Sequence, residues 1–149
     1  MCGNWKLINI IFINSYVTFF FMATINQLVE ELKNLSKRYS ELADSHGELF
    51  TKKDAERFQR RLIEAGKLVV DFYEKSFVPN YSKIQDPVIE VVGGNLSGLS
   101  QMASGFLENK NYFGLDALLT PRGSREGDPN CLDMLIQKLK KSKNKKFKR

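Results

Sequence analysis

The sequence predicts a mainly α-helical single domain, because two amphipathic patterns stand side by side in a chain of 149 residues. Over residues 25–78, apolar side chains recur at alternating steps of three and four, which places them on one stripe of each helix. Two stripes joined by a short polar turn bury best against each other. We therefore expect a long antiparallel helical hairpin, with two or three shorter C-terminal helices packed on it and a disordered basic tail.

The first stripe has the 3.5-residue average of a coiled-coil seam. A dimeric coiled coil could use it, but a matching stripe follows at once, so pairing within the chain is favoured. Gly47 is suited to end the first helix, and Thr51 with Asp54 forms a capping-box pattern at the start of the second. The residues expected along the helix–helix seam are Leu28, Leu32, Leu35, Tyr39, Leu42, Phe58, Leu62, Val69 and Tyr73.

Residues 1–23 form an apolar leader in which Lys6 is the only charged residue. Residues 7–23 form an apolar run that could be a membrane helix, held by residues 7–21, or a secretory signal. The run is at the lower limit of length for a membrane-spanning helix, and two asparagines weaken that interpretation. A dispensable leader is the favoured alternative, with Met22 as the true start, and a leader packed on the body is the third. Thr24 then serves as the N-cap of the first hairpin helix.

The C-terminal half is expected to begin with a connector over residues 79–94, because Pro79 ends the hairpin and Gly93-Gly94 forms a turn. Asn95 caps the next helix in this interpretation. Small residues Gly94, Gly98 and Gly105 would allow that helix to dock closely against the hairpin. The helices expected in this half span about 95–108, 112–119 and 129–141, the last with Asp128-Pro129 as its N-cap and N1.

The net charge of +6 is concentrated at one end of the chain. Residues 138–149 carry eight basic and no acidic side chains, whereas residues 24–78 carry ten of each sign. The folded body, within residues 24–139, is therefore close to neutral. Residues 140–149 have nothing to pack with and are expected to be disordered.

Residue patterns for catalysis, cofactor binding or metal binding are nearly absent. His46 is the only histidine and stands in the hairpin turn, and Cys2 and Cys131 show no metal or redox spacing. Residues 93–98 are glycine-rich but fit neither the dinucleotide fingerprint nor the P-loop. We therefore expect no enzyme and no cofactor.

The favoured function is a non-enzymatic helical protein-interaction or assembly module, with a protein partner or a second copy as its ligand. The first alternative is sequence-independent binding of nucleic acid. The second is a helical protein tethered to a membrane by residues 7–21. A cytoplasmic location is expected, nuclear if the host is a eukaryote, and membrane-anchored if the leader is retained. The basic residues assigned to nucleic-acid or acidic-surface contact are Lys138, Lys140, Lys141, Lys143, Lys145, Lys146, Lys148, Arg149, Arg57, Arg60 and Arg61.

Overall fold

The computed structural model describes residues 3–49, 51–120 and 131–147, and the side chains in these ranges except those of residues 3–20, 22, 48, 131 and 144–147. Most of these residues are helical and none of them lies in a strand, which confirms the mainly α-helical class. The elements are α1 (Gly3–Asp44), η1 (Ser45–Glu48), α2 (Lys52–Asp71), η2 (Phe72–Phe77), α3 (Val78–Tyr81), α4 (Pro87–Glu108), α5 (Tyr112–Leu119) and α6 (Cys131–Phe147).

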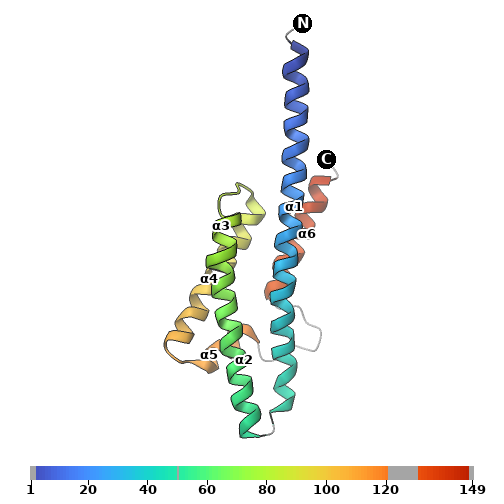
Figure 1. Ribbon diagram of the computed structural model, residues 1–149. Coiled ribbons are helices and arrows are strands. Elements are labelled where there is room, and N and C mark those ends of the chain that lie inside the picture. The colour runs from blue at the N-terminus through green and yellow to red at the C-terminus, as the bar shows by residue number, and fades with distance from the viewer. Residues whose placement is uncertain (1–2, 50, 121–130, 148–149) are drawn as a thin grey trace.

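Four long helices form an up-and-down bundle (Figure 1). The α1–α2 hairpin is present in the general form that the sequence predicts. α4 runs back down beside α2, and α6 returns upward beside α1. α1 packs more extensively on α6 than on α2, and α2 packs most extensively on α4. The hairpin is therefore half of a four-helix arrangement and not a self-contained scaffold.

The core runs along the inside of the bundle and draws on every long helix. Ser36 on α1 donates a hydrogen bond to Asp133 on α6 at 2.6 Å, which ties the two helices together. The largest fully buried side chains are Ile25, Leu28, Leu32, Tyr39, Leu62, Tyr81, Ile89, Leu96, Leu115, Leu119, Leu132 and Leu139.

The leader and the first hairpin helix are one continuous helix, so the expected boundary at Thr24 is wrong. α1 runs without a break from Gly3 to Asp44, and its N-terminal part projects beyond the rest of the bundle (Figure 1). Thr24 lies inside this helix and does not cap it. Helical hydrogen bonding that continues through the region removes the need for a cap there.

The expected connector over 79–94 is also wrong, because α4 begins at Pro87 and not at Asn95. The Asp86 carboxylate accepts hydrogen bonds from the backbone N–H groups of Val88 and Ile89 at 3.0 and 3.2 Å. Asp86 is thus the N-cap and Pro87 the first helical residue. Residues 88–92 and Gly93-Gly94, which were expected in the connector, are helical.

Pro79 does not end the hairpin either. It lies within α3, and a π-helical segment, η2, immediately precedes that helix. Proline has no N–H to donate to the carbonyl four residues earlier, and the wider turn of η2 changes the hydrogen-bond register before that point. The chain therefore stays helical to Tyr81.

α6 extends to Phe147, so the segment 140–147 is helical and not disordered. Apolar spacing continues through Leu139, and Ser142 is also buried. The predicted cap at Asp128-Pro129 lies outside the described residues. None of the helices in the described part of the chain combines the length and the hydrophobicity that a membrane span requires.

Candidate interaction surface

One exposed face of α4 differs from the rest of the surface, because it has no charged residue. Between Glu90 and Glu108, the sequence of α4 has none at all. The face follows helical steps of three and four along the outside of the bundle. We name it the neutral face and define it by Val91, Gly94, Asn95, Gly98, Gln101, Met102 and Gly105.

The glycines of the neutral face have open space around them. A Cβ atom added at Gly94, Gly98 or Gly105 would meet no heavy atom within 4 Å. At Gly93, in contrast, it would lie 2.8 Å from Cε1 of Phe77. The expectation that Gly94, Gly98 and Gly105 dock α4 against the hairpin is therefore wrong, and Gly93 makes that close contact instead.

Large apolar side chains lie among these glycines. Val91 is 48% exposed and Met102 is 52% exposed, more than is usual for side chains of this kind in a helix that also forms part of the core. The Asn95 amide donates to the Val91 carbonyl at 3.0 Å, so part of its polarity is satisfied within the helix. The face is thus smooth, uncharged and partly apolar.

A shallow groove of about 360 Å³ adjoins the neutral face at Gly94. It lies between η2 and the first turns of α4, and a ladder of aromatic rings forms one side. The rings of Tyr73 and Phe77 are 6.0 Å apart, and those of Phe77 and Tyr81 are 5.5 Å apart. The remaining lining residues are Ser82, Ile84, Ile89, Glu90, Gly93, Gly94 and Ser97.

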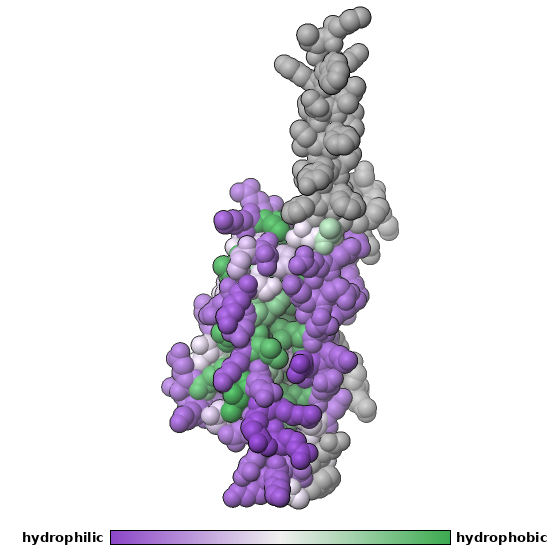
Figure 2. All heavy atoms as spheres, viewed as in Figure 1, coloured by the Kyte–Doolittle hydropathy of each residue, from purple (hydrophilic) through white to green (hydrophobic). Residues whose placement is uncertain are grey.

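A second hollow, of about 100 Å³, lies between α1 and α2. Figure 2 shows apolar residues between α1 and α2, bordered by hydrophilic ones. Its rim carries two basic and two acidic side chains, so it has no net charge. The residues around it are Arg38, Glu41, Leu42, Arg61, Glu64, Ala65 and Leu68. It is too small for a ligand larger than a few water molecules.

His46 joins a polar cluster that the sequence alone did not reveal. Its Nε2 lies 2.9 Å from Oδ1 of Asp116 and 3.0 Å from Oγ1 of Thr120. Its ring also contacts Phe58, with 4.7 Å between the ring centroids. This cluster fastens the hairpin turn to α5. The Thr120 hydroxyl is buried and donates to the backbone carbonyl of Asp116 at 2.8 Å and to its carboxylate, so we interpret the cluster as structural.

Glu31 makes a second set of polar contacts, which join α1 to η2 and α3. The Tyr81 hydroxyl donates to one carboxylate oxygen at 2.9 Å, and the Ser76 hydroxyl donates to the other at 3.3 Å. Burial raises the pKa of Tyr81 well above its ordinary value, and the hydrogen bond to Glu31 and its negative charge add to the effect.

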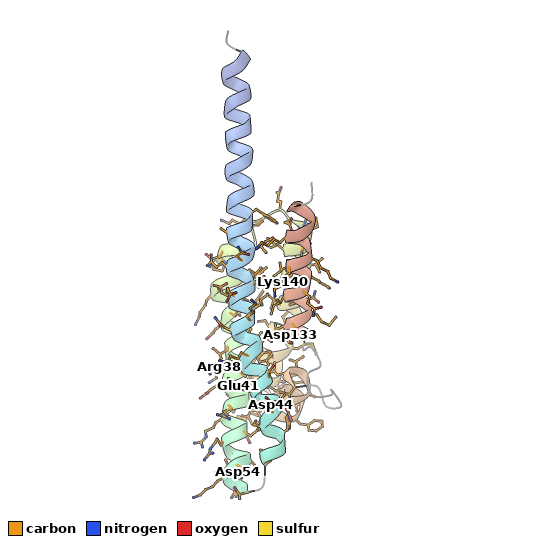
Figure 3. The ribbon with its side chains drawn as sticks, turned by 90° about the vertical axis from the view of Figure 1, so that its right-hand side faces the viewer. Arg38, Glu41, Asp44, Asp54, Asp133 and Lys140 are labelled. Carbon is orange, nitrogen blue, oxygen red and sulfur yellow. The ribbon has the colours of Figure 1, made fainter. Side chains whose placement is uncertain are left out.

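The basic residues assigned from the sequence do not form one surface. Arg57, Arg60 and Arg61 are exposed near the start of α2, whereas the lysines of α6 lie toward its C-terminal end. Figure 3 shows Lys140 far from Asp54, which marks the beginning of α2. Lys138, Lys140 and Lys141 are exposed, and Lys143 donates a hydrogen bond to Asn26 at 2.7 Å. The side chains of Lys145, Lys146, Lys148 and Arg149 lie outside the described set.

The residues assigned to the helix–helix seam point mainly inward. Leu28, Leu32, Leu35, Tyr39 and Leu42 on α1 are buried, as are Leu62 and Val69 on α2. Phe58 and Tyr73 are half-buried and pack against the core.

Within the described part of the chain, no three His, Cys, Asp or Glu side chains are grouped so that they could hold a metal ion. Comparison with known proteins found no matching protein family, no similar curated protein and no similar solved structure. The neutral face is therefore the most distinctive surface feature from which to argue a function. The glycine spacing of the neutral face is visible in the sequence. A helix that begins at Asn95 would exclude Val91 and Gly94, so the expected helix limits do not predict this face.

Proposed function

We propose that this protein is a non-enzymatic helical interaction module that binds an uncharged helical surface of a protein partner through the neutral face of α4. The observation that supports the proposal is the set of three glycines with open space at Gly94, Gly98 and Gly105. A glycine inside a helix costs about 1 kcal/mol relative to alanine. No contact within the described chain offsets that cost, whereas close approach of a partner's backbone would require it.

The chemistry of the face defines the partner. Val91 and Met102 supply apolar contact area, and the glycines between them allow two helix axes to come close. A partner with lysine or glutamate against this face would leave that charge without water and without an opposite charge. The partner surface is therefore apolar or amide-rich, and in the simplest case it is another helix.

The compartment in which the proposed complex forms is a reducing one. Two cysteines at distant positions in the sequence show no disulfide pattern. We propose the cytoplasm as its location. Membrane attachment through residues 7–21 stays a prediction, because the side chains of residues 7–20 lie outside the described set.

A single substitution tests the proposal. Gly98→Arg places a long charged side chain at the centre of the neutral face, where no atom of the chain obstructs a Cβ. Arginine has a higher helix propensity than glycine, so the variant should remain folded and melt no earlier than the wild type. Gln59→Arg is the matched control, because Gln59 is exposed on α2 and the substitution adds the same charge.

The measurement is affinity capture of the tagged full chain from its native cells, followed by mass spectrometry. We expect the wild type and Gln59→Arg to retain the same protein partners and Gly98→Arg to lose them. Identical capture by all three chains would reject the neutral face as the binding surface.

Salt separates this proposal from nucleic-acid binding. Contacts to an uncharged face release few counterions, so capture should change little with salt concentration. A tail that neutralises six to eight phosphates would lose about a thousandfold or more in affinity between 50 and 200 mM salt. Binding that collapses in this way, and that survives Gly98→Arg, would favour the basic end of α6 as the functional surface.

A further inference from the structure

We infer that the partner of the neutral face is a second copy of this chain, with the two α4 helices packed antiparallel about a two-fold axis at Gly98. The inference rests on the proposed function and names its ligand. An isologous interface requires a surface that complements itself. The neutral face meets this requirement in its spacing, in its charge and in the sizes of its residues.

Gly98 lies at the midpoint of the neutral face. Val91 stands seven residues before it and Gly105 seven residues after it. Antiparallel pairing about Gly98 therefore sets Val91 of one copy against Gly105 of the other. Each large exposed side chain at this level meets a position with open space.

The inner pairs are equally compatible. Gly94 and Asn95 stand four and three residues before Gly98, and Gln101 and Met102 stand three and four residues after it. In the antiparallel pair, Met102 of one copy lies over Gly94 of the other, and Gln101 lies over Asn95, so two uncharged amide side chains meet. The large apolar residues thus oppose glycine on both sides of the axis, and Gly98 opposes itself where the two backbones come closest.

Charge favours a second copy over an unrelated helix. The exposed face of most surface helices carries charged residues, but α4 has none between Glu90 and Glu108. Pairing α4 with itself buries no charge. The glutamates at the two ends lie on the rim of the contact, in water, where repulsion between them is screened.

The contact is small. Residues 91–105 span about 21 Å of helix, at 1.5 Å per residue. A helix pair of this length buries less area than a standard stable interface, so the dimer should dissociate on dilution. A reversible, concentration-dependent dimer is the expected state.

Disulfide trapping tests the axis directly, in the full chain with Cys2→Ser and Cys131→Ser. Gly98→Cys places the two thiols next to the two-fold axis, within the Cα separation that a disulfide bridges. Gln101→Cys is the matched variant, because the antiparallel arrangement separates the two copies of this residue by about 9 Å along the helix. We expect a covalent dimer with Gly98→Cys under mild oxidation and little with Gln101→Cys. Equal trapping of both, or of neither, would overturn the antiparallel pairing.

Light scattering of the chain without cysteine substitutions completes the test. The mass of the wild type should rise from monomer to dimer with concentration, whereas Gly98→Arg should stay monomeric and Gln59→Arg should behave as the wild type. A wild type that is monomeric at every concentration overturns the inference, as does association that persists in Gly98→Arg. If the monomeric wild type still captures partners that Gly98→Arg loses, only the identity of the partner is wrong. If capture is also unaffected, the proposed function fails as well.

Discussion

At the scale of single residues, adjacent glycines on α4 have opposite roles. Gly93 packs under the Phe77 ring, whereas Gly94 faces open space. The sequence shows only that two glycines are present, because a glycine pair is equally compatible with a turn and with a helix whose two faces differ. Which glycine is packed depends on where η2 lies, and no local pattern contains that information.

This contrast makes a stability prediction. Gly94→Ala should raise the free energy of unfolding by about 0.5–1 kcal/mol, because alanine lowers the entropic cost of the helix and its methyl group meets nothing. Gly93→Ala should lower it by about 1–3 kcal/mol, because the added methyl overpacks the core against Phe77. Urea denaturation in the Gly98→Arg background measures both without a contribution from association. Equal effects of the two substitutions would mean that the orientation of α4 is wrong.

At the scale of elements, the sequence predicts which segments are helical better than it predicts where each helix begins and ends. The capping-box pattern at Thr51 predicts the start of α2 correctly, and its reciprocal hydrogen bonds with Asp54 are 3.1 Å each. Asp86-Pro87 has the same Asp-Pro signature as Asp128-Pro129, and in the structure it is the N-terminus of α4. Residues 88–92, which are apolar except for Glu90, form a run too short for its period to distinguish helix from strand.

The tie between α1 and α3 gives a pH prediction. Burial, with the hydrogen bond to Glu31, raises the pKa of Tyr81 in the folded state above the value of about 10 that it has when unfolded. Above pH 10 the folded state therefore holds more protons than the unfolded state, so stability falls as the pH rises. Below pH 10 the contribution of Tyr81 is fully present.

Tyr81→Phe removes this titration. The variant should lose about 1 kcal/mol at neutral pH with the hydrogen bond, and its stability should decline less steeply than that of the wild type above pH 10. Denaturant unfolding at several pH values from neutral to alkaline compares the two slopes. Parallel slopes would show that the Tyr81 hydroxyl is not buried against Glu31.

At the scale of the whole molecule, the sequence predicted the helical class and the hairpin but not the bundle. Periodicity identifies which face of α1 is apolar, but α6 and α2 compete for that face and their registers are set by contacts distant in sequence. The charge count separated the basic end from a neutral body. The fold adds that the basic segments of α2 and α6 are far apart, so they do not form one nucleic-acid surface.

Amide hydrogen exchange of the full chain tests most directly whether the neutral face is a binding surface. Amides covered by an interface exchange more slowly than the same amides in the free chain, and peptides from each helix report separately. From dilute to concentrated wild-type protein, we predict slower exchange confined to residues 91–105 of α4, and no change in Gly98→Arg. Slower exchange elsewhere, in α6 or the hairpin, or an identical response in Gly98→Arg, would contradict the account.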